Sequence, residues 1–562
     1  MKHPYYILGL AAALAVATPS FAQNDGDRND GKYNPTVSGS IQSDMLAPTG
    51  SQSDGSHEDF CTNTFVDLNV MSKYIDAGAR FEYREHQLPG YDAAFKGYGV
   101  PYVYLKAKLK NFEVTVGNFY EQFGSGFVLR TYEERSLGID NSLLGARIVT
   151  TPVKGVRLKA LTGQQRRYWA HNDSWVSGAD VELSLDSWFK GLAQSGTSLT
   201  LGGSFVNKNE RNDEDVPFNG NYRLVMPRNV NAWDARVTLN THGFNVLAEY
   251  AQKTADPSFK NKYIYRKGTA AMLSASYSKK GFSVLAQAKR SDNFFFNSYR
   301  GESLAQSTIN HLPAFTMDQT YALAALYPYG TRLDGEWAYQ GQLGYKFKRK
   351  TAIGGKYGMM VKVNFSHVRG IDQNPRSLTV NVPEPTVLTG RGTDGYGSAF
   401  WKWGKGGMYY QDLNVQVDRR FTRDFKLSLM YMNQFYNKTV VEGEGGMIHS
   451  NIFIADALFN LSPKTRLRTE LQYLTTGEDE HDWLFALAEL SLVPHWMFTV
   501  SDQYNVGLTD AHYWQTFVTY NTGAHRVQLG WGRTRAGFNC SGGVCRYVPE
   551  TKGFTLSYNY NF

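Results

Sequence analysis

The sequence predicts an all-β protein, a large antiparallel transmembrane β-barrel. Three features indicate this fold: a secretory signal at the amino terminus, a carboxy-terminal strand with one apolar face, and regular alternation of short and long polar connections. The composition agrees, because the 562 residues include 36 Tyr, 33 Phe and 54 Gly. After the signal there is no apolar stretch of about 20 residues, so membrane-spanning helices are excluded.

Residues 1–22 are typical of a signal peptide that directs secretion across the inner membrane. They contain a basic start at Lys2, an apolar run from Tyr6 to Ala17, and small residues Ser20 and Ala22 before the expected cut. The run is too short for a membrane anchor. We expect residues 23–33 to be a mobile periplasmic segment, too short for a folded plug, and residues 34–562 to form one barrel.

The last ten residues, GFTLSYNYNF, alternate perfectly between apolar and polar side chains. From Phe554 to Phe562, every second residue is aromatic or apolar, and these residues lie on one face. The residues between them, from Thr555 to Asn561, are Thr, Ser and Asn and lie on the other face. This period of two predicts a strand. A soluble edge strand of this kind would promote aggregation, whereas a closed barrel has no edge. The terminal aromatic residue is typical of strands recognised by outer-membrane assembly machinery, which predicts the outer membrane of a Gram-negative bacterium.

Short turns and longer polar segments alternate along the chain. The turns lie near residue 110 and at 152–155, 241–243, 278–281, 422–424, 462–464, 493–494 and 521–525. The longer segments lie at 87–97, 123–141, 166–177, 208–230, 253–268, 291–335, 368–406, 436–447 and 535–552. This pattern predicts about 24 strands (22–26), short periplasmic turns and long external loops. A barrel of this size has a lumen wide enough for water or for folded loops.

Basic residues dominate the positions that alternation turns into the lumen. They are Lys106, Lys108, Arg157, Lys159, Arg236, Lys289, Lys426, Arg466 and Arg468, against the acids Glu113, Glu121, Asp234 and Glu470. Because charged side chains set pore selectivity, we expect a porin-like channel for anionic or polyhydroxylated solutes. The alternative is that these charges only solvate one another across a blocked barrel. A net charge of +8 gives no case for nucleic acid.

In the stretch GNFYEQFGSGFVLR at 117–130, the second and third glycines come where a strand should leave the membrane. Glycine in a strand marks a bend, so Gly124 and Gly126 predict a kink at the external rim. The kink would turn a set of charged residues toward the pore mouth as gate candidates: Glu121, Arg130, Glu133, Glu134 and Arg135. The alternative is that these charges pin neighbouring loops.

Two other loops carry distinctive residues. Residues 310–330, NHLPAFTMDQTYALAALYPYG, are too apolar for a solvated external loop, so we expect them to fold into the lumen or to pack against a partner. A self-packed external loop is the alternative. Cys540 and Cys545 in the last long loop are expected to form a disulfide, although Cys61 in the first external loop could pair with either.

No pattern predicts an enzyme. The acids around His481 in GEDEHDW (477–483) are better interpreted as a solvated loop than as a metal or protease site. His449 and Ser450 are adjacent and point to opposite faces of a strand, so they form no nucleophile–base pair. Zinc-ligand spacing, a phosphate loop and a nucleophile elbow are absent from the sequence. We therefore expect neither a cofactor nor a metal.

Several motifs resemble those of a known family. GNFYEQFGSGFVLRTYEERSLGIDNSLLGAR, LPAFTMDQTYALAALYPY and GGKYG at 354–358 resemble an uncharacterised family of Bacteroidetes-type outer-membrane β-barrels, a domain of unknown function. The resemblance covers nearly the whole chain and implies the fold, but no substrate. The chain is more distantly similar to polysaccharide-conducting porins. We expect outer-membrane lipids around it, with a small-molecule or oligosaccharide solute. The alternative function is an accessory subunit of an outer-membrane assembly or secretion complex, with protein partners at the external loops.

Overall fold

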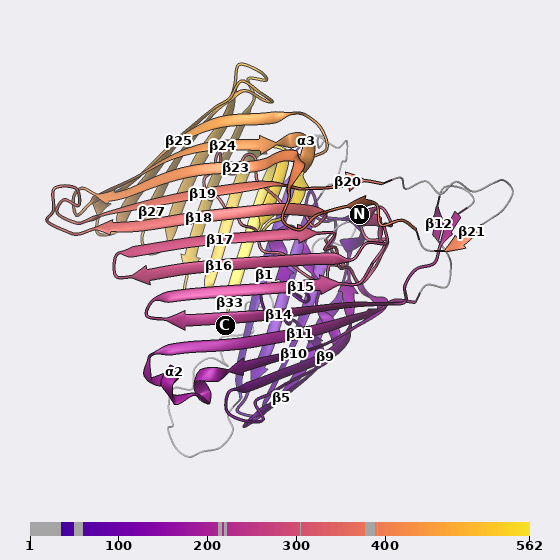
Figure 1. Ribbon diagram of the computed structural model, residues 1–562. Coiled ribbons are helices and arrows are strands. Elements are labelled where there is room, and N and C mark those ends of the chain that lie inside the picture. Colours follow the sequence, from indigo (N-terminus) through magenta and orange to yellow (C-terminus); the bar gives the residue numbers. More distant parts are fainter. Residues whose placement is uncertain are drawn as a thin grey trace, which may run out of the picture.

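A computed structural model describes residues 35–49, 60–211, 216–218, 222–303, 305–376, 388–390 and 392–562. The expected signal peptide and the segment 23–33 lie outside these residues. The described chain forms a closed 24-stranded antiparallel β-barrel, which confirms the predicted fold class and strand number (Figure 1). Each barrel strand pairs with the next barrel strand along the chain, and the last strand pairs with the first.

The bounds of the barrel strands, in chain order, are as follows: β1 (Thr36–Pro48), β2 (Cys61–Met71), β3 (Ile75–Arg84), β4 (Gly97–Leu109), β5 (Phe112–Phe119), β8 (Leu143–Thr150), β9 (Val156–Arg167), β10 (Ala170–Ser184), β11 (Thr197–Asn209), β14 (Asn229–Thr241), β15 (Phe244–Lys253), β16 (Gly268–Lys279), β17 (Phe282–Asp292), β18 (Gly335–Phe347), β19 (Met359–Ile371), β23 (Trp403–Arg420), β24 (Phe425–Asn437), β25 (Met447–Ser462), β26 (Thr465–Thr475), β27 (Asp482–Leu492), β28 (Trp496–Val506), β29 (His512–Thr522), β30 (His525–Thr534) and β33 (Thr551–Asn561).

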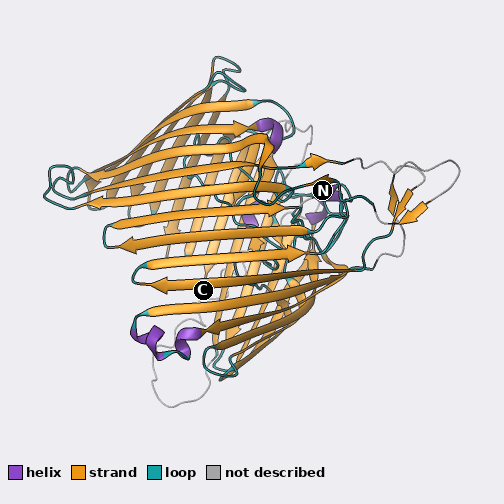
Figure 2. Cartoon of the chain, viewed as in Figure 1, coloured by secondary structure: helices purple, strands orange, loops and turns teal. Residues whose placement is uncertain are grey.

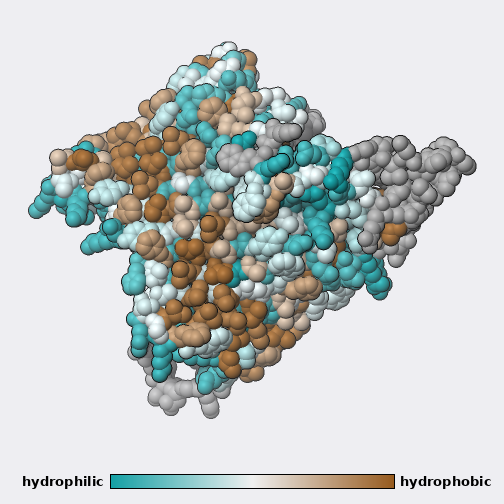
Figure 3. Space-filling model, viewed as in Figure 1, coloured by the Kyte–Doolittle hydropathy of each residue, from teal (hydrophilic) through white to brown (hydrophobic). Residues whose placement is uncertain are grey.

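The side chains of each strand alternate between the outer wall and the lumen, as the sequence pattern predicts. On β4, Val103 and Leu105 are about half exposed on the outer wall, at 48% and 53%, while Lys106 and Lys108 face inward. On β33, Phe554 is exposed outside, and Ser557 faces Asp44 of β1, to which it donates a hydrogen bond of 2.7 Å. Apolar side chains gather over the strands of the outer wall, with hydrophilic ones toward the barrel ends (Figure 3).

The two ends of the barrel differ in their connections. One end, at the left of Figure 1, carries connections such as 110–111, 242–243, 280–281 and 523–524, and we call it the short-turn end. The other end carries 85–96, 120–142, 210–228, 293–334 and 535–550, and we call it the long-loop end. The prediction of a long loop at 166–177 is wrong. Tyr168 adopts a positive φ of 55°, so the chain turns at 168–169, and a register shift between His171 and Trp175 absorbs the polar residues into β10.

Short strands and helices lie in the connections between the barrel strands (Figure 2). The short strands are β6 (Glu133–Glu134), β7 (Ile139–Asp140), β12 (Val216–Phe218), β13 (Tyr222–Leu224), β20 (Asn374–Pro375), β21 (Leu388–Gly390), β22 (Tyr396–Gly397), β31 (Gly537–Ser541) and β32 (Val544–Val548). The helices are η1 (Ala93–Phe95), η2 (Arg135–Leu137), η3 (Leu185–Ser187), α2 (Lys190–Gln194), η4 (Phe259–Asn261) and α3 (Lys438–Val441). Among the described residues, no helix has the length and apolar character needed to cross a membrane.

Candidate functional site in the barrel lumen

The connection 120–142, between β5 and β8, folds back into the barrel, and we call it the first lumen segment. Phe123, Phe127, Val128 and Leu129 are completely buried in one apolar cluster. The wall contributes inward-facing residues to this cluster: Leu161, Val176, Val206, Val230, Ala232, Ala251 and Ala270. Burying large aromatic side chains against this wall fixes the segment inside the lumen.

The connection 293–334, between β17 and β18, also lies inside the barrel and is the second lumen segment. Phe294, Phe296, Ile309 and Leu312 join the cluster of the first segment. Residues 315–329 form a second cluster on another part of the wall, where the inward-facing residues include Val368, Met432, Ile452, Leu474 and Trp483. The structure therefore places the apolar loop 310–330 in the lumen, which is one of the placements expected from the sequence.

Polar contacts hold the second lumen segment against the same wall. The backbone N–H of Leu323 donates to Gln472 at 2.8 Å, and Gln434 donates to the carbonyl of Tyr327 at 3.0 Å. The ammonium of Lys289 donates to the carbonyl of Pro313 at 2.6 Å. Because these bonds lie in a buried setting, releasing the segment would leave polar groups without partners.

The two glycines of the first lumen segment both adopt positive φ, 52° at Gly124 and 102° at Gly126. They bend the chain as predicted, but the prediction that this bend lies at the external rim is wrong. A Cβ on Gly124 would lie 2.9 Å from Arg236 and 3.0 Å from Glu249, which belong to the interiors of β14 and β15. Ser125 N–H donates to Glu249 at 3.1 Å. The positive φ at Gly124 and the close passage of the backbone along the wall both favour glycine here.

The gate candidates separate into two groups. Glu121 forms ion pairs with Arg147 and, at 2.9 Å, with Lys159. Glu133 lies 2.8 Å from Arg80, and Arg135 bridges Glu133 at 2.7 Å and Asp67 at 2.9 Å. Glu121, Glu133 and Arg135 thus tie the first lumen segment to β2, β3, β8 and β9.

The other two gate candidates make local contacts. The Arg130 guanidinium lies 5.0 Å from the ring of Tyr132, and its backbone N–H donates to Ile309 of the second lumen segment at 2.8 Å. The carboxylate of Glu134 accepts from the N–H and hydroxyl of Ser136. A gating role for these five residues remains a prediction.

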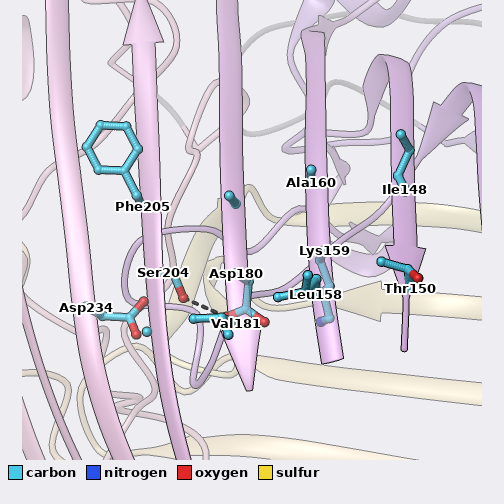
Figure 4. A pocket seen from close by; sticks show the side chains of 12 residues that line it. Ile148, Thr150, Leu158, Lys159, Ala160, Asp180, Val181, Ser204, Phe205 and Asp234 are labelled. Atoms are coloured by element: carbon cyan, nitrogen blue, oxygen red, sulfur yellow. Dashed lines mark hydrogen bonds between the residues drawn. The ribbon is translucent and has the colours of Figure 1, made fainter. Parts of the chain in front are cut away.

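Most of the predicted lumen cations have an acidic neighbour. The ion pairs join Lys106 to Glu113, Lys108 to Asp76, Arg157 to Glu182, Lys159 to Glu121, Arg236 to Asp180 and Asp234, Lys289 to Glu336, Lys426 to Asp418, and Arg468 to Asp456. Figure 4 shows Asp180, Ser204 and Asp234 on neighbouring strands, with Ser204 donating to Asp180 at 2.8 Å. Arg466 lies beside the short turn 463–464 and is exposed.

A buried network that sequence reasoning missed anchors the end of the first lumen segment. Arg166 is 1% exposed and lies 2.8 Å from Glu82 and 2.6 Å from Asp140. Asp140 also lies 3.2 Å from Arg80. Buried charges need such partners, because one left alone costs several kcal/mol. The partners are far apart in sequence, so alternation alone gave no signal for them.

The hairpin β31–β32 touches both lumen segments at the long-loop end. Cys540 and Cys545 are joined in a disulfide within it, while Cys61 begins β2 and is buried. The hairpin's Arg546 donates to the carbonyl of Ser136 in the first segment at 2.9 Å. Its Gly543 carbonyl accepts from Thr331 of the second segment at 2.8 Å.

The inner face of β28, β29, β30 and β33 differs from the rest of the wall. Most of its half-buried side chains are neutral and polar, although Met497, Tyr513 and Phe517 lie on the same face. We call the polar set the neutral wall: Thr499, Ser501, Gln503, Gln515, Gln528, Thr555, Ser557 and Asn559. Arg526, beside the turn 523–524, also lies on this face and is exposed. Partial exposure of inward side chains indicates that solvent reaches this part of the lumen. Over the described residues no cluster of His, Cys, Asp or Glu could hold a metal ion.

The comparison with family models identifies the chain. Residues 2–562 match the model of a family of unknown function, DUF6029. The chain belongs to the DUF6029 family. No curated protein matches it in sequence.

Several solved barrels have a similar architecture. The siderophore receptor PirA from Pseudomonas aeruginosa is 11% identical, with a TM-score of 0.40 over 96% of this chain and 81% of the receptor. The translocation pore of the P pilus usher PapC is 10% identical, with a TM-score of 0.43 over 94% and 99%. OccAB3 from Acinetobacter baumannii is 8% identical, with a TM-score of 0.35 over 94% and 99%. Likeness at this level says nothing about what this chain binds or transports.

Proposed function

We propose that this DUF6029 member is an outer-membrane channel for neutral, polyhydroxylated solutes, narrowed by its two lumen segments. The apolar outer wall supports membrane insertion: Leu105, Val116 and Leu471 are more than half exposed there. Large exposed apolar surface of this kind needs a lipid environment. The closed strand ladder satisfies the backbone inside such an environment.

The observation that carries the proposal is the charge distribution in the lumen. Cations such as Lys159, Arg236 and Arg468 lie in ion pairs with acids, so their fields are largely cancelled at short range. The neutral wall instead offers hydroxyl and amide groups to a passing solute. These groups match the donors and acceptors of a sugar, which favours polyhydroxylated over anionic solutes.

Liposome swelling tests this proposal. Proteoliposomes containing the full chain should swell in an isotonic disaccharide faster than protein-free liposomes, and faster than in an isotonic organic anion of similar size. Ser501→Leu, which places a bulky apolar group on the neutral wall, should slow the sugar. Val500→Leu is the matched control, because Val500 is 51% exposed on the outer face of the same strand. Sugar impermeability, or equal slowing by both variants, would contradict the proposal.

A second candidate function is docking of a protein partner at the long-loop end. Trp401, in the connection before β23, is 82% exposed, and the small sheet of β12, β13 and β21 stands beyond the barrel (Figure 1). We propose that an accessory role would use this surface. Cross-linking in cells should then capture a defined partner that Trp401→Ala loses, while the sugar permeability of the purified chain stays unchanged.

A further inference from the structure

A polar cavity of about 400 Å³ lies in the inner wall beside the first lumen segment. Strands β2 to β5 and β8 form it, with Tyr120 from the lumen segment. Its lining includes Asn69, Tyr102, Tyr104 and Asn118. The volume is within the range of about 300–1,000 Å³ that small-molecule sites occupy.

Two buried polar atoms in this lining have no hydrogen-bond partner. They are the hydroxyl of Thr115 and the side-chain nitrogen of Asn118, in residues that are 2% and 4% exposed. Buried polar groups are normally paired, and an unpaired one costs about 1–3 kcal/mol. The Asn118 oxygen already accepts from the N–H of Val103 at 3.0 Å, so its amide orientation is fixed by that bond. Its nitrogen is therefore a fixed, unused donor.

Tyrosine rings supply the other half of the cavity. Tyr102 and Tyr120 stack with centroids 5.3 Å apart and planes inclined by 17°, and Tyr104 meets Tyr102 edge-on at 6.0 Å. The hydroxyl of Tyr104 donates to Asn69 at 3.2 Å. Such an arrangement combines apolar ring faces with polar edges, which suits a ligand that has both C–H and O–H groups.

The charges in the lining are matched within the protein. Arg80 is held by Asp67 and Glu133 at 2.8 Å each, and Arg147 is bound by Glu113 at 2.5 Å. An anionic ligand would therefore have to compete with carboxylates already in place. A neutral ligand would add hydrogen bonds to the unused groups without displacing any of these pairs.

We propose that this cavity binds one unit of a neutral saccharide. The ring of the sugar lies against the tyrosines, and its hydroxyls accept from the Asn118 nitrogen and pair with the Thr115 hydroxyl. The role of this site in solute passage rests on the proposed function, because a binding site on the lumen wall would favour sugars over other solutes. Binding itself is measurable without transport.

The test is calorimetry or saturation-transfer NMR on the full chain in a detergent without a sugar headgroup. Maltotriose and cellotriose are the probes, with glucuronate and inorganic phosphate as anionic comparisons. Saturable binding of a neutral trisaccharide, with little or no binding of the anions, supports the proposal. Absence of saccharide binding, or binding of the anions alone, overturns it.

Three variants locate the binding. Thr115→Val removes the hydroxyl at nearly constant shape, and Asn118→Asp keeps the oxygen that accepts from Val103 while removing the donor nitrogen. Each should weaken saccharide binding about tenfold, which is the effect of about 1.4 kcal/mol. Thr516→Val, on the outer face of β29, should leave it unchanged. If all three folded variants bind the saccharide with the affinity of the wild-type chain, the assignment of the site is overturned.

The outcomes separate this proposal from the channel. Sugar binding without sugar permeability refutes the channel and retains the site. Sugar permeability without binding, or with binding that ignores Thr115 and Asn118, refutes the site and retains the channel.

Discussion

Phe123 offers the sharpest perturbation of the lumen. It is completely buried in the first lumen segment, and its ring lies against the wall at Gly178, where an added Cβ would be 2.9 Å from it. Phe123→Ala removes this packing and leaves a cavity, which costs about 3–5 kcal/mol. If that energy holds the segment in place, its released population rises by about two to four powers of ten, since 1.4 kcal/mol is a factor of ten.

Single-channel recording in planar bilayers measures this population. Phe123→Ala should show more frequent and larger openings than the wild-type chain. Phe205→Ala is the matched control, because Phe205 is 49% exposed on the outer face of β11 and lies apart from the lumen acids in Figure 4. Both variants must retain the gel mobility of a folded barrel. Identical conductance of both variants and the wild type would refute the view that apolar packing keeps the lumen narrowed.

Three further perturbations act on the same segments. Glu121→Gln should increase openings and lower thermal stability, because Arg147 and Lys159 each lose one carboxylate partner in a buried setting. Unchanged recordings and melting would contradict this. Reduction of Cys540–Cys545 should increase openings by freeing the hairpin, whereas the double Ser variant should not respond to reductant. Burial lowers the pKa of His311 to about 3, so its neutral form is required in the folded lumen. Packing of the second segment should therefore weaken as the pH falls from about 6.5 toward 3, by up to about 1.4 kcal/mol per pH unit. Openings should rise at pH 4.5, and less so in His311→Asn; equal pH dependence in both would exclude this histidine.

The barrel could be predicted from sequence because its strands obey a period of two and its turns are local. Strands such as β4 and β33 are readable residue by residue, and the alternating connections give the number of strands. The inward-folded loops are less visible. The part of the barrel wall that contacts these loops carries apolar residues on its inner face as well as its outer face, as at Val176 and Val206. This loss of alternation was the available signal that apolar loops pack inside.

The lumen network was beyond sequence reasoning for a different reason. Arg166 and Glu82 are 84 residues apart, and only the closed ladder of strands brings them together. Gly124 shows the intermediate case. Its bend was predictable because glycine tolerates a positive φ, but its depth in the lumen depends on contacts with β14 and β15.

The most direct test of the central claim is the reversal potential of the open channel in a tenfold potassium chloride gradient. The ion pairs of the lumen and the neutral wall predict weak selectivity, with a reversal potential near zero. A potential approaching the anion limit of about 59 mV would mean that unpaired basic residues line the path, and would contradict a channel for neutral solutes.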